Sequence, residues 1–166
     1  MDRQSPADER LALVRDSFED FYSRELQPQV RQATFLLGSV AEAEDVVHDC
    51  FVELHARWGS IADPGPYLQR SVLNRSRDRL RRRAMRRRVD EQFRPIDVPE
   101  TEVPLFDALA SLSFHQRAAV VLKFYCGLSH AEIADRLDCS TGSVGPWIKR
   151  GLEGLATQLQ LPNEES

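Results

Sequence analysis

The sequence lacks any apolar run long enough to cross a membrane, and it contains few cysteines. No stretch of its 166 residues comes near the roughly eighteen consecutive apolar residues of a membrane-spanning helix, so membrane insertion is not expected. The first ten residues, MDRQSPADER, are polar and show no secretory signal. The three cysteines lie far apart, without the spacing of a metal or disulfide motif. These absences favour a cytoplasmic protein with reduced thiols, in which Cys50 and Cys126 are core residues.

Lysine is also scarce, whereas arginine is concentrated in one stretch. Residues 70–94 hold eleven arginines and three acidic residues, although the whole chain has a net charge of −4. The segments before and after this block are both acidic. A basic block inside an otherwise acidic protein is expected to face a polyanion. A solvated helix face or a disordered tail is the alternative interpretation.

Helical spacing of apolar residues runs through the first third of the chain. It predicts a helix over residues 11–37, with Pro28 expected to kink or restart it. A second helix is predicted over residues 39–58, where Ser39 and Glu42 form a capping-box pattern. Its two faces differ in character. The predicted buried stripe is Val47, Cys50, Phe51, Leu54 and Trp58, and the acidic face holds Glu42, Glu44, Asp45, Asp49 and Glu53.

Most of the arginine block also has helical periodicity. After a loop rich in glycine and proline over residues 59–66, a helix is predicted over residues 67–83. A packing stripe repeats every four residues, at Leu68, Val72, Ser76, Leu80 and Ala84. Spacings of three and four residues place another set on one exposed face, namely Arg70, Asn74, Arg77, Asp78 and Arg81. This periodicity argues against a disordered tail for residues 67–84.

Proline and acidic residues separate this half of the chain from a second helical half. Residues 89–104 contain three prolines and five acids with little periodicity, which predicts an acidic, flexible linker. Helices are then predicted over residues 105–111, 114–125, 129–137 and 143–159. No strand alternation of useful length is present. The predicted fold class is therefore all-α, with two small helical domains over residues 15–88 and 105–160 and flexible ends over residues 1–14 and 161–166.

Residues 114–155 have the layout of a helix-turn-helix. Ser129 and Glu132 form a capping box at the start of a short helix, and Asp138 with Cys139 makes the turn. The next helix is capped by Ser140, Thr141 or Ser143, and its predicted inner stripe is Val144, Ile148 and Leu152. The first residues of such a helix enter the DNA major groove. The exposed candidates for this contact are Thr141, Ser143, Trp147, Lys149 and Arg150, and a plain three-helix bundle is the alternative.

Three segments match, in order, the patterns of one protein family. The segment AEAEDVVHDCFVELHARW is similar to a conserved helix written DAEDVVQEAF, and YLQRSVLNRSRDRLRRR is similar to WLxxIAxNxxxDxxRR, with Tyr67 in the Trp position. The segment LFDALASLSFHQRAAVVLKFYCGLSHAEIADRLDCSTGSV is similar to LxxALxxLPxxQRxVxxLRxxxGLSYxEIAxxLGxSxGTV. Together they resemble regions two and four of the extracytoplasmic-function (ECF) group of bacterial sigma-70 factors. The resemblance covers residues 15–87 and 104–159.

This resemblance implies a factor that binds core RNA polymerase and directs promoter recognition, DNA melting and transcription initiation. The acidic helix would dock on the basic clamp of the largest polymerase subunit through Asp45, Val46, His48, Asp49 and Val52. The arginine helix would bind the minus-ten element of promoter DNA through Arg70, Asn74, Arg75, Arg77, Arg81 and Arg82. Arginines suit phosphate contacts, Asn74 suits a base edge, and Asp78 is expected to be a structural partner of the arginines. The helix-turn-helix would bind the minus-thirty-five element. An anti-sigma factor is a further partner that the resemblance suggests.

The chain departs from the family pattern at the start of the recognition helix. Where the family has GTVKSRLHRARxRL, this chain has GSVGPWIKRGLEGL. Proline inside a helix removes a backbone donor and costs about 3 kcal/mol. The helix is therefore expected to begin later, with Ser143 as its cap and Pro146 in its first turn. The predicted consequence is weakened or altered reading of the minus-thirty-five element, with Lys149 and Arg150 left as phosphate contacts.

Two other functions stay open at this point. A stand-alone helix-turn-helix regulator would bind an operator without polymerase, although it has no need for an acidic docking face. An adapter that binds polymerase without reading promoters is consistent with Gly145 and Pro146. An enzyme is not expected, because the four histidines have no carboxylate or nucleophile partner pattern and no phosphate-binding loop is present. No metal or cofactor is expected either.

Overall fold

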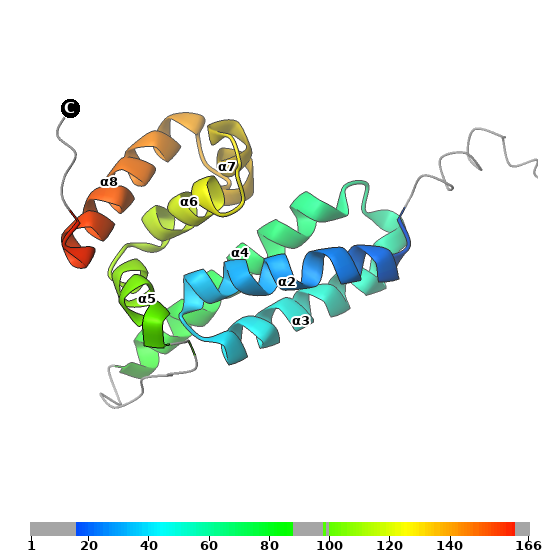
Figure 1. The fold of residues 1–166 in the computed structure, drawn as a ribbon. Coiled ribbons are helices and arrows are strands. Elements are labelled where there is room, and N and C mark those ends of the chain that lie inside the picture. Colours follow the sequence, from blue (N-terminus) through cyan, green and yellow to red (C-terminus); the bar gives the residue numbers. More distant parts are fainter. Residues whose placement is uncertain (1–15, 88–97, 99, 162–166) are drawn as a thin grey trace, which may run out of the picture.

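The computed structural model describes residues 16–87, 98 and 100–161, and every regular element within these ranges is helical. The prediction of an all-α fold is confirmed. Figure 1 shows a first bundle formed by α2, α3 and α4, with a second helical bundle formed by α5–α8 lying against it. The first bundle consists of α2 (Phe18–Leu37), α3 (Val40–Ala56), the short 3₁₀ helix η1 (Trp58–Ser60) and α4 (Pro64–Arg87). The second consists of η2 (Glu100–Glu102), α5 (Val103–Ala110), α6 (Phe114–Phe124), α7 (His130–Leu137) and α8 (Thr141–Leu159).

The junction between α2 and α3 is set by local sequence. Gly38 ends α2 in the left-handed conformation with a φ of 69°, which favours glycine, and its N–H donates to the carbonyl of Thr34. The next residue, Ser39, caps α3 by accepting a hydrogen bond from the N–H of Glu42 at 3.2 Å. A single glycine–serine pair therefore turns the chain through the tight connection between two antiparallel helices.

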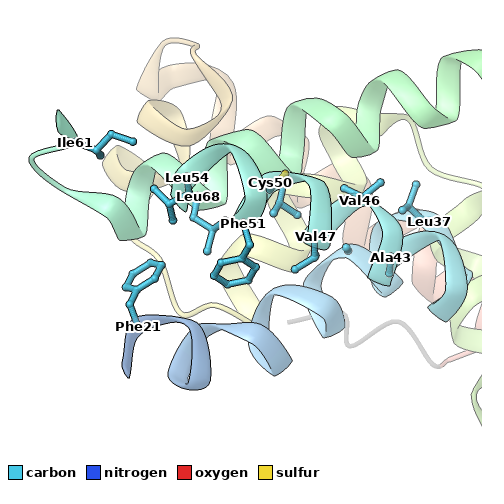
Figure 2. Packing of buried hydrophobic residues seen from close by; sticks show 12 residues of the cluster. Phe21, Leu37, Ala43, Val46, Val47, Cys50, Phe51, Leu54, Ile61 and Leu68 are labelled. Carbon is cyan, nitrogen blue, oxygen red and sulfur yellow. The ribbon is translucent and has the colours of Figure 1, made fainter. Parts of the chain in front are cut away.

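The core of the first bundle follows the predicted stripe of α3. Val47, Cys50, Phe51 and Leu54 are buried, and Trp58 packs against them from η1. Figure 2 shows Phe51 and Leu54 of α3 between Phe21 of α2 and Leu68 of α4. Burial raises the pKa of the Cys50 thiol to about 12, so this cysteine acts as an apolar core residue, as predicted.

Two prolines lie inside helices where the sequence pattern suggested helix boundaries. Pro28 was expected to kink or restart a helix; the helix does not restart there, because α2 runs without interruption from Phe18 to Leu37. Pro28 is on the solvent side, where water can satisfy the carbonyl that loses its helical donor. Pro64 opens α4 before the predicted start, because the first turn of a helix needs no N–H from its residues. In the same way α5 begins at Val103, so the last two residues of the predicted linker belong to a helix. Most of the rest of the predicted linker, residues 89–97 and 99, lies outside the described ranges.

The second bundle contains the predicted helix-turn-helix. The capping box of α7 is complete, with the hydroxyl of Ser129 accepting from the N–H of Glu132 and the carboxylate of Glu132 accepting from the N–H of Ser129. Asp138 makes the turn in the left-handed conformation with a φ of 52°. The predicted inner stripe of α8 is correct for Val144 and Ile148 and wrong for Leu152, which is exposed. Gly151 faces inward instead, because α6 approaches too closely to leave room for a larger side chain there.

The two bundles share apolar packing. Leu36 of α2 and Leu73 of α4 are buried in the same cluster as the apolar residues of α6, α7 and α8. Phe35 of α2 stacks on Phe106 of α5, with ring centroids 5.5 Å apart. Helix α3 lies on the side of the first bundle that faces away from α5–α8 (Figure 1). No described helix is both long and apolar enough to span a membrane.

Candidate nucleic-acid interface

Helix α4 positions one row of the predicted DNA-contacting residues. Arg70, Asn74 and Arg77 line the same cavity of about 470 Å³, as their spacing of three and four residues requires. The opposite wall of this cavity comes from α7 and the following turn, with Asp135, Arg136 and Asp138 among its residues. Asn74 is exposed at this site. The structure therefore brings together three residues of the predicted face of α4 and adds a second wall, from α7, that the sequence pattern did not predict.

Polar contacts join the two walls. The guanidinium of Arg70 donates to the carboxylate of Asp135 at 2.7 Å, forming an ion pair that is half exposed on both sides. Beside it, Nε of Arg136 donates to Oε1 of Gln69 at 2.9 Å, and Nε2 of Gln69 donates to Gln32 at 2.9 Å. Arg77 lies against the ring of Phe114 in α6, 5.8 Å from its centroid. The helix-turn-helix thus holds side chains of α4 that are suited to nucleic-acid phosphates.

Arg75 belongs to a different contact. Its guanidinium donates to Glu53 of α3 at 2.7 Å, and the hydroxyl of Tyr67 donates to the same carboxylate at 3.2 Å. The hydrogen bonds from Arg75 and Tyr67 lower the pKa of Glu53, which stays ionised. The structure does not place Arg75 on the face of Arg70 and Asn74, because its position on the helix turns it toward α3. The contact with Glu53 gives Arg75 a role in joining α3 to α4.

The last turns of α4 carry two solvent-exposed arginines and one that is hydrogen-bonded to α2 and paired with α3. Arg81 and Arg82 are exposed, as their predicted role requires. Arg83 donates to the carbonyl of Leu37 at 2.8 Å and pairs with the carboxylate of Glu42. Since Leu37 ends α2, this arginine satisfies a carbonyl that has no donor within its own helix. Arg83 is therefore a structural residue. The sequence pattern did not distinguish it from the neighbouring arginines of the same run.

Arg117 is a second structural residue that the sequence pattern did not predict. It is only 8% exposed, and it lies in an apolar stretch of α6. Its guanidinium donates to the carbonyl of Leu36 at 2.5 Å, across the two bundles, and to the carbonyls of Ala110 and Leu112 at 3.1 Å within the second bundle. Burial lowers the pKa of Arg117 to about 10, so the side chain remains charged at neutral pH. The sequence signal for this role was an arginine within an apolar helical segment. That signal does not identify the carbonyls to which the guanidinium donates.

The acidic face of α3 is open to solvent. Asp45, His48 and Asp49 are exposed, and Val52 is 57% exposed beside them. Val46, which the sequence analysis assigned to the same contact surface, is only 3% exposed and packs in the core. That assignment is wrong because the helical register directs Val46 to the same side as Val47 and Cys50. The other four residues, Asp45, His48, Asp49 and Val52, form the α3 face.

The recognition helix begins earlier than expected. Ser140 is the residue before α8, and the helix runs from Thr141 through Pro146, which therefore lies in the second turn. Pro146 offers no N–H to the carbonyl of Gly142. The hydroxyl of Ser143 lies 2.9 Å from that of Ser140.

The predicted minus-thirty-five residues are only partly free. Thr141, Lys149 and Arg150 are exposed. Trp147 is half-buried, packs against the second core and stacks on His115, with ring centroids 4.6 Å apart. Burial, with Arg77 and Arg81 adding to it, lowers the pKa of His115, which favours its neutral form in this stack. Trp147 thus has a packing role where a free DNA contact was predicted.

Comparison with known proteins decides the identity of the chain. The family model for sigma-70 region 2 matches residues 21–86, and the model for sigma-70 region 4 matches residues 103–155. The chain belongs to the sigma-70 family. The RNA polymerase sigma-E factor of Streptomyces avermitilis is 28% identical over 152 residues, covering 86% of this chain and 85% of the relative. The sigma-E factor of Streptomyces coelicolor is 27% identical over 151 residues, with 86% and 85% covered.

Solved structures show the same fold. The sigma factor RpoE from Bartonella quintana, in complex with the anti-sigma factor NepR, has a TM-score of 0.68 at 21% identity, over 87% of this chain and 99% of that one. CnrH, in complex with the cytosolic domain of CnrY, has a TM-score of 0.66 at 26% identity, over 86% and 87% of the two chains.

The protein is a sigma factor of the ECF group. It binds core RNA polymerase and directs it to promoters, where transcription begins. The first bundle is sigma region 2 and the second is sigma region 4. The match to region 2 argues against a stand-alone operator-binding regulator, which requires the helix-turn-helix alone. Sigma factors are initiation factors and not enzymes. Within the described ranges, no group of three His, Cys, Asp or Glu side chains is arranged to hold a metal ion.

Proposed function

We propose that this sigma factor uses opposite sides of region 2 for its two main partners. The α3 face docks on core polymerase, and the row of Arg70, Asn74, Arg77 and Arg81 on α4 binds the minus-ten element. The observation that carries this proposal is the separation of charge between two exposed helix faces packed on one core. Acidic residues gather on α3, whereas this α4 row consists of three arginines and one asparagine, and Asp78 beside them is the one acidic residue of α4.

The α3 face has the composition of a docking surface. Two carboxylates, Asp45 and Asp49, precede Val52 along the same side of α3, and this apolar side chain is 57% exposed. Apolar side chains at the centre of an interface, surrounded by charges that fix the orientation, are typical of protein–protein contacts. The partner proposed from the family resemblance is the clamp of the largest polymerase subunit, whose expected basic charge complements these acids.

The α4 row suits a strand whose bases have been separated. Three arginines spaced along one side can each neutralise a phosphate, and Asn74 among them can form directional hydrogen bonds to a base edge. Arg82 is exposed on the neighbouring side of α4 and supplies a further backbone contact. Arg75 is left out of this row because Glu53 holds it against α3.

Region 4 is proposed to read the minus-thirty-five element weakly. Pro146 lies in the turn of α8 that would enter the major groove, Trp147 is held by His115, and Gly142 and Gly145 present no side chain. Thr141, Ser143, Lys149 and Arg150 are left as contacts, of which the last two are cationic and suited to phosphates. Sequence discrimination by the full factor would then depend mainly on α4.

The remaining parts of the proposal concern regulation and location. The structural relatives RpoE and CnrH are each seen with a partner, NepR and the cytosolic domain of CnrY. By analogy, an anti-sigma factor is proposed to hold this chain as well. The chain is placed in the cytoplasm, where its polymerase partner works, and is proposed to have no catalytic activity or cofactor of its own.

Replacing both Arg70 and Asn74 with alanine is expected to lower promoter opening about tenfold, because a bidentate base contact and a phosphate contact are lost together. The slope of log affinity against log salt should fall by about one unit for the lost phosphate contact. Opening is measured by permanganate reactivity of unpaired thymines, using core polymerase and a promoter mapped with the unaltered factor.

The matched control is Arg24→Ala with Gln27→Ala, which removes an arginine and an amide from the exposed side of α2. This control should open the promoter normally, and both double variants should bind core polymerase with the affinity of the unaltered protein. Normal opening by the Arg70→Ala, Asn74→Ala protein would show that the α4 row does not contact the minus-ten element.

A further inference from the structure

A second cavity lies where the end of α2 and the second half of α4 meet α5 and α6. Its volume is about 570 Å³, within the range of cavities that hold small molecules. It shares Arg77 and His115 with the cavity at Arg70 and Asn74, but none of its lining residues comes from α7. It is therefore a separate candidate site, to which the proposed function assigns no ligand.

Most of the wall of this cavity is apolar. The leucines and phenylalanines that line it come from four helices and include Leu36, Leu37, Leu80, Phe106 and Phe114. Such a surface gains free energy when an apolar group displaces water from it. A ligand that fills this cavity must therefore have an apolar body.

The charged groups of the cavity are cationic. Four arginines line it, and no carboxylate among the described residues does. Arg83 is paired with Glu42, whereas Arg77, Arg81 and Arg117 form no ion pair with any acid in the part of the chain that the structure describes. Three unbalanced positive charges therefore surround one largely apolar space.

Arg117 is the strongest indication that an anion belongs here. The residue is only 8% exposed, and its terminal nitrogens donate to three backbone carbonyls, which carry no full charge. Its Nε is buried and has no hydrogen-bond partner within the described ranges. Burial, with Arg83 adding to it, lowers the pKa of Arg117 to about 10, as expected for a buried cation without a counter-ion. Buried charges are usually paired, so an anion in the cavity would supply the missing partner.

We propose that this cavity binds a small amphipathic anion, which carries one carboxylate or phosphate group on an apolar body. The negative group lies in the field of Arg77, Arg81 and Arg117, and the apolar body contacts the leucines and phenylalanines. Arginine suits both kinds of headgroup, because its planar fork of donors matches the oxygens of a carboxylate or a phosphate. A bare phosphate would leave the apolar wall in contact with water, and an uncharged alkyl chain would leave the arginines unbalanced.

Isothermal titration calorimetry of the full chain tests the site, with octanoate as the carboxylate probe and octyl phosphate as the phosphate probe. At least one of them should bind as a single molecule per protein, and the one that binds more tightly identifies the headgroup. Inorganic phosphate and 1-octanol should each bind about tenfold more weakly or worse, because each offers only one half of the interaction. Binding of neither amphiphile, or equal binding of 1-octanol or inorganic phosphate, would overturn the proposal.

Two variants place the bound probe in this cavity. Arg81→Met removes a charge and keeps an apolar stem, so binding of the probe should weaken about tenfold. Its matched control is Arg82→Met, which removes the same charge from a neighbouring exposed position that does not line the cavity. Ala84→Phe adds a ring to the cavity wall and should abolish binding, whereas Ala131→Phe on the exposed side of α7 should not. Equal effects within either pair would show that the probe does not bind in this cavity.

A consequence for DNA follows, and it rests on the proposed function, whereas the site itself does not. Arg77 and Arg81 belong to the proposed minus-ten row, so the bound probe should lower promoter opening by the unaltered protein. Opening by Ala84→Phe should not respond to the probe, which controls for direct effects on the polymerase. If calorimetry shows binding and promoter opening does not fall, the minus-ten assignment of these two arginines is wrong, and the anion site stands.

Discussion

Replacing Arg117 with methionine is expected to lower the free energy of unfolding by about 3 kcal/mol, because three buried carbonyls lose a charged donor at once. Two of them, on Leu36 and Ala110, lie in the last turns of α2 and α5, where no helical N–H is available to replace the guanidinium. Methionine keeps much of the apolar volume and removes the cost of burying a cation. That cost is real, since burial lowers the pKa of Arg117 to about 10, but it does not offset three unsatisfied acceptors.

Chemical denaturation followed by circular dichroism measures this loss. Arg117→Lys should lie between the two proteins, because one ammonium can replace the charge but cannot span the three carbonyls. Arg24→Met on the exposed side of α2 should change stability by less than about 0.5 kcal/mol, as surface substitutions do. An Arg117→Met protein as stable as the unaltered protein would mean that this arginine does not join region 4 to region 2.

Replacing Asp45 and Asp49 together with alanine is expected to weaken binding to core polymerase at least tenfold. This corresponds to a loss of about 1.4 kcal/mol in binding free energy. Both side chains are exposed and lie one turn apart, so they face the same partner surface. The loss should appear mainly as slower association and should shrink as salt is added, because complementary charges steer the encounter. Fluorescence titration of labelled protein with purified core polymerase gives the affinity, and stopped-flow mixing of the same two components gives the association rate.

The paired control is Glu19→Ala with Glu153→Ala, which removes two exposed carboxylates from α2 and α8. The two double variants have the same net charge, so a difference between them reports the position of the acids. Neither pair lies in a core, and both variants should fold as the unaltered protein does. Equal affinities for polymerase would show that the α3 face is not the docking surface.

Local sequence was sufficient to predict the helices and most of their faces. The spacing of Arg70, Asn74 and Arg77 placed them on one side of α4, and the capping box at Ser129 fixed the start of α7, because both depend on residues within one or two turns. Val46 was placed wrongly because an apolar residue at the edge of a polar face can turn either way, and the tertiary core decides.

Contacts between distant residues could not be predicted from such patterns. Arg70 and Asp135 are 65 positions apart, and Arg117 and the carbonyl of Leu36 are 81 positions apart. A helical pattern gives the face on which a residue lies and not the element that packs against it. The helix boundaries predicted from Pro28 and Pro146 were wrong for a related reason. The free-energy cost of a proline inside a helix depends on whether solvent can reach the carbonyl four residues earlier, and this is a property of the folded surface.

Transcription of host genomic DNA by purified core polymerase, with and without this protein, tests the central claim most directly. The 5′ ends of the transcripts are mapped by sequencing. As a promoter-directing sigma factor, the protein should produce a defined set of new start sites that share a short sequence just upstream, and the Arg70→Ala, Asn74→Ala variant should lose them. If the protein binds core polymerase and yet produces no new start sites, it is an adapter, and the account of promoter opening by α4 is contradicted.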